Sequence, residues 1–245
     1  MINKKDTIVI IPAYNEEKSI QLVLSDIPKD RIIEIIVVNN NSTDSTVKKA
    51  LDQEALVVTE TQQGYGAACL KGLKEASQFS PEIIVFLDAD YSDHPQEMNL
   101  LLEQIDQGND LVIGCRNLGK AEKGSLLIQA IFGNWLATFL TFHLFGGPRF
   151  HDLGPFRAIK TSALDQIKMT DKDFGWTIEM QVKAIVFALK IAQVSVSYRK
   201  RIGQSKITGT IKGTILAGKK ILQTIFFLKY KLRKESKKSL NDSSL

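Results

Sequence analysis

The sequence predicts a single-domain α/β protein with a mainly parallel sheet and helices on both faces. Two observations support this prediction: short apolar runs recur through the first half of the chain, and helical patterns separate them. The runs lack the alternation of half-buried strands, so both faces of the sheet should be covered. A chain of 245 residues lies within the size of one compact domain.

The expected strands are runs rich in β-branched residues, at 7–11, 33–38, 56–59, 83–87 and 111–113. Helical spacing of apolar residues follows the first and third of these runs, at Ile20, Val23, Leu24 and Ile27 and at Ala67, Leu70 and Leu73. Ligands of such sheets bind outside the carboxyl ends of the strands. The loop after each run is therefore where a functional site is expected.

An uncharged stretch spans residues 124–148, where His143 is the single titratable side chain. Its length would permit a membrane span. Polar residues such as Gln129 and Asn134 interrupt the stretch, and Gly133 lies in its middle, which favours a buried or interfacial pair of helices. The span stays open as the alternative.

The C-terminal part predicts a basic amphipathic helix over residues 207–230, where lysines such as Lys219 and Lys220 lie among apolar residues. We expect a domain over residues 1–230 that ends in this helix. Residues 231–245 are basic and polar, and their composition predicts a disordered tail.

Charge is distributed unevenly along the chain, whose net charge is +5. Residues 198–245 hold 13 basic and 2 acidic residues, whereas the first 197 hold 19 basic and 25 acidic residues. A basic C-terminal fifth behind an acidic body predicts attraction to phosphates, on a nucleic acid, a lipid surface or a small substrate. The alternative is a solvated helix face and tail.

The two cysteines, Cys69 and Cys115, lie far apart among apolar residues, which predicts buried free thiols and a reducing compartment. The first apolar run is too short for the apolar region of a signal peptide. We therefore expect a cytoplasmic protein.

Two carboxylates, Asp88 and Asp90, directly follow the fourth expected strand. Acids held side by side at a strand end repel one another, and a hard divalent cation such as Mg²⁺ or Mn²⁺ relieves that repulsion. The cation can also bridge a diphosphate and stabilise it as a leaving group. The alternative is an acid pair that caps a helix opened by Pro95.

Three further strand-end loops carry polar or small residues. Residues 11–17 offer backbone groups, the aromatic edge of Tyr14 and acids that equally complement a helix dipole. Residues 38–44 hold polar side chains suited to a base and ribose, although a hydroxyl there could simply cap a helix. Gly64 and Gly66 mark a helix entrance near which phosphates could bind.

Together these loops resemble those of family 2 glycosyltransferases with the GT-A fold, and within them the dolichyl-phosphate mannose and glucose synthase-like branch. The resemblance covers about residues 7–220. It implies that the nucleotide is held by Pro12, Ala13, Tyr14, Glu16 and Asp44. The expected donor site consists of these residues with Asn39, Gly64 and the DxD element Asp88, Ala89 and Asp90.

Three later motifs extend the resemblance: Gly114 and Arg116; Asp152, Gly154, Pro155, Phe156 and Arg157; and Arg201, Gly203, Ser205 and Lys206. The last motif combines a guanidinium, a hydroxyl and an ammonium, which suits it to phosphate. As alternatives to a functional role, Arg116 could pair with a surface acid, and Arg201 could belong to a solvated strand end. The expected catalytic residues are Asp88, Asp90, Arg116, Asp152, Arg201 and Lys206.

The chain departs from the family pattern in two places. Relatives commonly carry two aspartates where this chain has Asn39 and Asn40. Because an amide can donate or accept a hydrogen bond, the base of the donor stays open between UDP and GDP. Residues 91–94 also lack the glutamine that some relatives use near the metal.

The resemblance implies inverting transfer of a sugar from a nucleotide-sugar donor, with the metal on Asp88 and Asp90. We expect a polyprenyl phosphate acceptor, peripheral contact with the inner face of the membrane, and no nucleic-acid partner. A phosphate acceptor is already ionised, whereas a hydroxyl acceptor would need a base, for which Asp152 is the candidate.

Two other classes of function remain as alternatives. A sugar-nucleotide pyrophosphorylase would need a glycine-rich first loop, which this chain lacks. A non-enzymatic module that binds membrane surfaces through its basic part would leave the acid pair unexplained.

Overall fold

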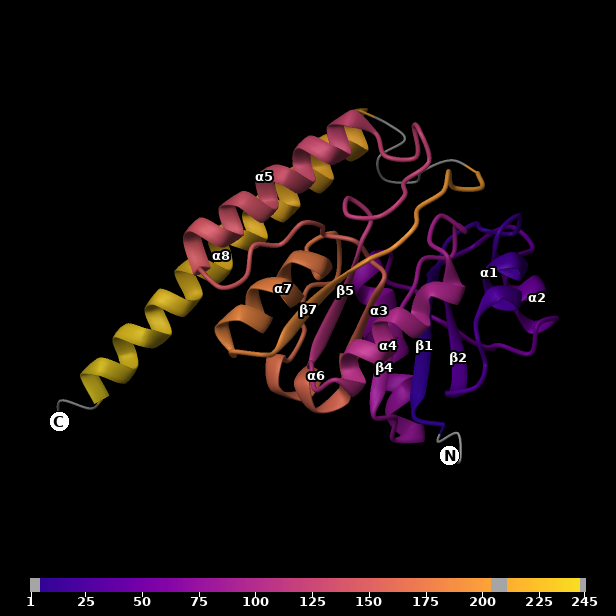
Figure 1. Cartoon of the computed structure of the whole chain (residues 1–245), viewed down its shortest axis with the longest axis horizontal. Coiled ribbons are helices and arrows are strands. Elements are labelled where there is room, and N and C mark those ends of the chain that lie inside the picture. The colour runs from indigo at the N-terminus through magenta and orange to yellow at the C-terminus, as the bar shows by residue number, and fades with distance from the viewer. Residues whose placement is uncertain (1–4, 204–210, 243–245) are drawn as a thin grey trace.

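The computed structural model describes residues 5–203 and 211–242, which form one seven-stranded sheet flanked by helices (Figure 1). The strands are β1 (Thr7–Ala13), β2 (Ile32–Asn39), β3 (Leu56–Thr59), β4 (Ile83–Phe86), β5 (Leu111–Cys115), β6 (Arg157–Lys160) and β7 (Ile191–Ser195). Their order across the sheet is β3-β2-β1-β4-β6-β5-β7, and all neighbours are parallel except where β6 takes part. The predicted single-domain fold with a mainly parallel sheet is confirmed.

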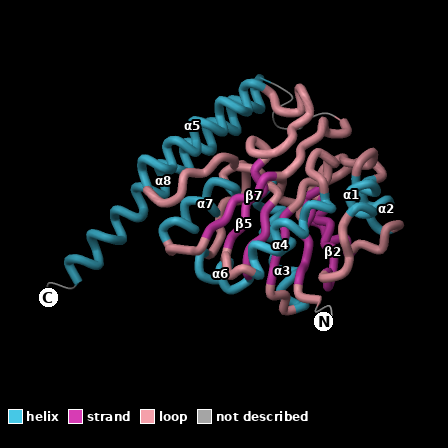
Figure 2. The backbone as a smooth tube through the Cα atoms, in the orientation of Figure 1, coloured by secondary structure: helices cyan, strands magenta, loops and turns pink. Residues whose placement is uncertain are grey.

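Helices cover both faces of the sheet, as Figure 2 shows. One face carries α1 (Ile20–Asp26), α2 (Thr46–Leu51) and α4 (Met98–Asp106), which follows the 3₁₀ turn Pro95–Glu97. The other carries α3 (Tyr65–Ala76), extended by the 3₁₀ turn Ser77–Phe79, together with α6 (Thr161–Ile167) and α7 (Trp176–Val186). Because strand side chains alternate, Val9 and Ile11 pack in the first layer, and Ile8 and Ile10 in the second.

Strand β6 is antiparallel to both of its neighbours, and its first residue, Arg157, pairs with Phe86 of β4 and Ile113 of β5. Apolar runs alone do not predict it, because it has only four residues and charged ends. Nor do they predict β7, whose residues are at most half-buried. The antiparallel direction brings the segment before Arg157 to the carboxyl end of β4.

The strand order places a crevice beside β1. After β1 the chain continues outward through β2 and β3, and then returns to the other side of β1 as β4. The loops after β1 and β4 diverge at this point, which is where ligands of open α/β sheets bind.

The apolar stretch forms one helix, α5 (Ile128–Phe145), so the predicted helix pair is wrong. A glycine in a helix is about 1 kcal/mol less favourable than alanine, and Gly133 lowers the stability of α5 without ending it. Within the described ranges, α5 is the single helix long and apolar enough to cross a membrane, and 17% of it is buried.

Helix α8 (Ile211–Asp242) lies beside α5, and its C-terminal part extends beyond the rest of the molecule (Figure 1). The two helices share a small apolar core with α7: Ala137, Ile178, Val182, Ile225 and Leu228. The helix continues through Asp242, in contrast to the disordered tail predicted from residue 231. The last stretch has no glycine or proline after Gly218, and its many Lys, Leu and Arg residues favour helix.

Candidate active site

A cavity of about 410 Å³ opens at the carboxyl ends of β1, β2 and β4. Its volume is within the range of roughly 300–1,000 Å³ that is typical of small-molecule sites. The lining residues are Pro12, Ala13, Tyr14, Glu16, Asn40, Gln63, Gly64, Tyr65, Ala68, Asp88, Ala89, Asp90, Asp173, Phe174 and Arg201. Most of the donor-site residues predicted from the sequence therefore come together here.

The acid pair lies inside this cavity. Asp90 is buried, and its Oδ1 accepts a hydrogen bond from the backbone N of Ser92 at 2.8 Å, while its Oδ2 forms an ion pair with Arg201. Burial and the negative charge of Asp90 raise the pKa of Asp88 to about 7. The charge of Asp90 thus disfavours ionisation of Asp88, and a cation in the cavity would relieve this.

This donor set fits a hard divalent cation. Both acids offer carboxylate oxygens, which Mg²⁺ and Mn²⁺ prefer, and the guanidinium of Arg201 against Asp90 shows that the site attracts positive charge. The described part of the chain contains no group of three side chains able to hold a metal. A bound ion would therefore complete its coordination with water and with phosphates of the donor.

The loops after β1 and β2 are tied together by their own side chains. Asp44, one of the predicted nucleotide ligands, accepts hydrogen bonds from the backbone N of Thr46 at 3.0 Å and of Glu17 at 3.2 Å. It does not line the cavity. Burial opposes its charge, but the hydrogen bonds from Thr46 and Glu17 dominate and lower its pKa. Asp44 thus fixes the shape of the first loop.

The two asparagines of the second loop have different surroundings. Asn39 accepts a hydrogen bond from the backbone N of Ser42 at 2.9 Å and lies outside the cavity lining. Asn40 lines the cavity, donates to the backbone O of Glu60 and Gln62 at 2.9 Å, and accepts from the N of Gly64 at 2.9 Å. Asn40 therefore ties its own loop to residues 60–64, a role that the sequence does not reveal.

The buried Asp152 forms an ion pair with the half-buried Arg116 outside the cavity lining. Oδ2 of Asp152 accepts from the backbone N of Arg116 at 2.9 Å and from its Nε at 2.8 Å, and Oδ1 accepts from Nη2 at 2.7 Å. Burial opposes ionisation of Asp152, but the charge and hydrogen bonds of Arg116 lower its pKa. Both oxygens are thus engaged, which suits Asp152 to orienting Arg116 better than to removing a proton.

We expect Asp152→Asn to act mainly on stability. Breaking a buried ion pair leaves Arg116 uncompensated and lowers the free energy of unfolding by about 3 kcal/mol, or the Tm by roughly 6–12 °C. A thermal melt measures this, with the exposed Asp165→Asn as the control. An unchanged Tm with loss of the acidic limb of the pH–rate profile would instead identify Asp152 as a base.

Of the last predicted motif, Arg201 lines the cavity, whereas Ser205 and Lys206 lie outside the described residues. Arg157 is fully buried and, among the residues that the structure describes, donates to the backbone carbonyls of Gly154 and Thr177. Burial lowers its pKa to about 10. It therefore holds the segment before β6 in place.

Sequence reasoning misses two buried polar groups near the acid pair. Asp93 is 2% exposed, and neither of its carboxylate oxygens makes a hydrogen bond to any described residue. Burial and the charge of Asp88 raise its pKa well above the ordinary value. The hydroxyl of Tyr65, which lines the cavity, is likewise buried, and it lies close to Asp88.

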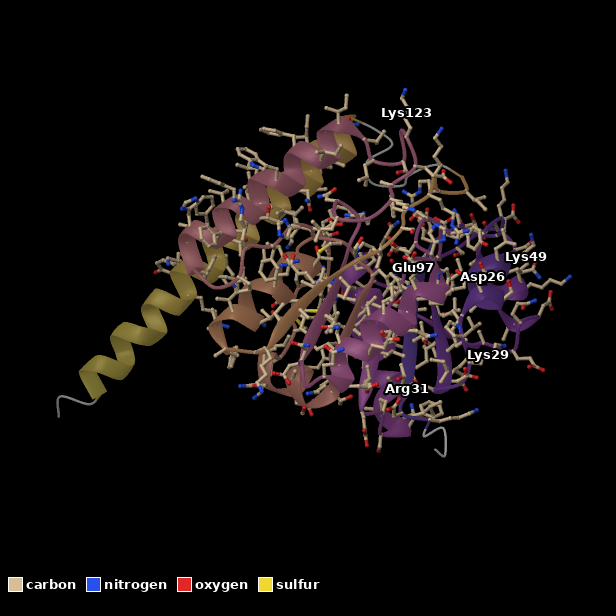
Figure 3. The ribbon with its side chains drawn as sticks, viewed as in Figure 1. Asp26, Lys29, Arg31, Lys49, Glu97 and Lys123 are labelled. Atoms are coloured by element: carbon tan, nitrogen blue, oxygen red, sulfur yellow. The ribbon has the colours of Figure 1, made fainter. Side chains whose placement is uncertain are left out.

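A second cavity, of about 500 Å³, lies at the opposite end of the sheet. Figure 3 shows Arg31 there, near the N-terminus and away from Lys123 at the other end. Three of the charged residues that line this cavity are paired with one another, since Arg31 binds Asp6 at 2.6 Å and Asp106 at 2.7 Å.

The sequence profile of glycosyl transferase family 2 matches residues 8–168, and the chain belongs to this family. The predicted family is thereby confirmed.

Two relatives match over most of their length. An uncharacterised glycosyltransferase of Mycobacterium tuberculosis is 32% identical over 85% of this chain and 93% of its own. A dolichyl-phosphate hexose transferase of Haloferax volcanii is 31% identical over 89% of this chain and 93% of its own.

Among solved structures, glucosyl-3-phosphoglycerate synthase from Mycobacterium tuberculosis, in complex with Mn²⁺, uridine diphosphate and phosphoglyceric acid, superposes with a TM-score of 0.73. The match has 22% sequence identity and covers 92% of this chain and 78% of that one. This likeness shows that the two chains share a fold.

Proposed function

We propose that this glycosyltransferase transfers a hexose, with inversion at the anomeric carbon, from a nucleotide-sugar to a polyprenyl phosphate of the dolichyl type. The observation that carries the proposal is the acid pair, Asp88 and Asp90, inside a cavity at the crevice beside β1, with Arg201 against it. The loops that line the rest of the cavity suit a nucleoside diphosphate.

Asp88 and Asp90 would hold Mg²⁺ or Mn²⁺, which when bound neutralises negative charge that develops on the departing diphosphate. The relative with Mn²⁺ and uridine diphosphate in its crystal structure supports this choice of ion. The side chains of this cavity then contribute mostly by positioning and electrostatics. Arg201 supplies a second positive group beside the phosphates.

The reaction is a single displacement. A phosphate oxygen of the acceptor forms a bond to the anomeric carbon, and the bond from that carbon to the diphosphate breaks, so that the nucleoside diphosphate leaves. An acceptor phosphate is ionised at neutral pH and requires no base. This agrees with Asp152, whose two oxygens are both bound by Arg116. It therefore favours a phosphate acceptor over a hydroxyl acceptor.

The lipid part of the acceptor has a matching surface on α5 and α8. Large apolar side chains stand exposed there: Ile128, Phe132, Trp135, Phe139, Ile215, Leu216, Phe226, Phe227 and Tyr230. Exposed patches of this kind mark sites of membrane or protein contact, and lysines such as Lys219 lie among them. The dolichyl-phosphate hexose transferase among the relatives supports a lipid-linked acceptor.

We propose peripheral attachment at the cytoplasmic face of the membrane. Basic residues near an anionic surface contribute about 1 kcal/mol each, which adds to the burial of apolar side chains.

Peripheral attachment implies that the protein co-sediments with anionic vesicles in a salt-sensitive manner and binds neutral vesicles more weakly. Trp135→Ser should lower vesicle binding about tenfold, because it removes an exposed aromatic side chain from the contact surface. Leu22→Ser, on the exposed side of α1, is the matched control and should bind as the wild type does.

The acceptor is tested by supplying the enzyme with a polyprenyl phosphate or with a soluble sugar. We expect transfer to the lipid phosphate in the presence of a divalent cation. A protein that ignores vesicles at low salt and glycosylates only the soluble sugar would contradict the lipid acceptor, and would return Asp152 to consideration as a base.

A further inference from the structure

Residues 170–174, between α6 and α7, form part of the wall of the donor cavity. Asp173 and Phe174 line it, in the same cavity as Asp88 and Asp90. A half-buried carboxylate and an aromatic ring are groups that can bind hydroxyls and the flat face of a sugar or base. The position of this wall segment therefore bears on how the donor is held.

Glu179 of α7, which is 2% exposed, holds the first residues of the wall segment, residues 170–174. Its carboxylate accepts hydrogen bonds from the hydroxyl of Thr170 at 2.6 Å and from the backbone N of Asp171 at 2.7 Å. Lys183 compensates its charge at 2.7 Å. This anchor is buried within the domain itself.

The wall segment also packs directly on the start of α3. The backbone N of Ala67 donates to the backbone O of Lys172 at 2.9 Å. A Cβ on Gly64 would lie 2.2 Å from that same oxygen, and a Cβ on Gly66 would lie 2.2 Å from the backbone O of Asp171. The two glycines therefore allow the wall segment to approach α3 so closely.

The third anchor comes from α8, through Asp171. Oδ1 of Asp171 accepts hydrogen bonds from the backbone N of Asp173 at 2.7 Å and of Gly175 at 3.1 Å, which turns the chain into α7. Its Oδ2 faces α8, where the Nζ of Lys220 lies at 3.2 Å and the hydroxyl of Thr224 at 3.5 Å. One carboxylate thus links the cavity wall to the helix that carries the exposed apolar side chains.

We infer that Lys220 is a positioning residue for the donor: through Asp171 it holds Asp173 and Phe174 in place against the bound nucleotide-sugar. Helix α8 is then a structural part of the donor site as well as a surface helix. The inference rests on the proposed function, since it concerns the nucleotide-sugar cavity.

Lys219 provides a matched control within the same helix. It is exposed, whereas Lys220 is half-buried, and Lys219 makes no ion pair with the residues the structure describes. Replacing either lysine removes one positive charge from α8. A general effect of charge or of membrane contact should therefore be the same in both variants, and an effect through Asp171 should appear only for Lys220.

The experiment titrates UDP- and GDP-hexoses, with Mn²⁺ and without vesicles, into the full chain by calorimetry. For whichever donor binds the wild type, we expect Lys220→Ala to raise the Kd about threefold and Lys219→Ala to leave it unchanged, as a partly exposed ion pair predicts. Asp171→Asn, which keeps an acceptor for the backbone N of Asp173, should match Lys220→Ala, and Lys220→Arg should restore binding.

The double variant Asp171→Asn with Lys220→Ala should bind no more weakly than either single variant, because both remove the same contact. Thermal melts of all variants separate this effect from loss of the fold. Equal Kd values for the two lysine variants, or a Kd of Lys220→Ala that matches the wild type, would overturn the inference while the proposed function stands. A wild-type protein that binds no nucleotide-sugar in the presence of metal would overturn the proposed function itself.

Discussion

Asp90→Asn is expected to abolish metal-dependent transfer, with a fall of about 10³-fold or more in kcat/KM. The substitution removes a carboxylate charge and preserves the shape of the side chain. The remaining amide oxygen can still accept the hydrogen bond from the backbone N of Ser92, so the loop after β4 should keep its conformation. A transfer assay across a titration of Mg²⁺ or Mn²⁺ measures the loss.

The matched control is Asp106→Asn at the opposite end of the sheet. Asp106 also pairs with an arginine, Arg31, but its side chain is 55% exposed and lies far from the donor cavity. This variant should transfer sugar at the wild-type rate. A folded Asp90→Asn protein with full activity over the metal titration would remove the central claim about the acid pair.

Arg201→Ala should lower kcat by about 10²- to 10³-fold, because it removes a positive group that lines the cavity beside the phosphates. The affinity for the free nucleoside diphosphate should stay near that of the wild type. Affinity for the divalent cation should not fall, because Arg201 forms an ion pair with Asp90 and so competes with the metal for that carboxylate.

Calorimetry with the nucleoside diphosphate and metal, set beside steady-state kinetics, separates these effects. Arg201→Lys is the conservative variant, which retains the charge and should recover part of the turnover. A loss of nucleotide affinity equal to the loss of turnover would mean that Arg201 only holds the donor.

Strands β1 to β5 could be predicted because burial on both faces leaves local apolar runs, as at β1 and β4. Strand β6 could not, since its position depends on two long-range antiparallel pairings and its residues include Arg157 and Lys160. The helix pair expected in place of α5 rests on polar residues such as Gln129 and Asn134 and on Gly133 in the middle of the stretch. In the structure, α7 and α8 pack against α5 from Ala137 onward, a long-range contact that the local pattern does not encode.

The same distinction between local and long-range information holds for the site. Asp88 and Asp90 are separated by one residue in the loop that follows β4, so their shared position follows from local structure. Asp44 lies in an expected loop, but its side chain turns to backbone groups of the neighbouring loop, which a sequence pattern does not encode. The sequence signal for the wall segment is the pair Gly64 and Gly66. The structure shows why both are glycine: any Cβ there would collide with the backbone oxygens of residues 171–172.

The residues that line the donor cavity range in sequence from Pro12 to Arg201, and Lys220 contacts its wall through Asp171. The last strand, β7, ends at Ser195, before either of these basic residues. During synthesis, N-terminal parts of a chain are available to fold first. A growing chain therefore has all of its strands before it has a finished donor cavity, and a chain that ends before α8 would have the sheet without the brace on the cavity wall.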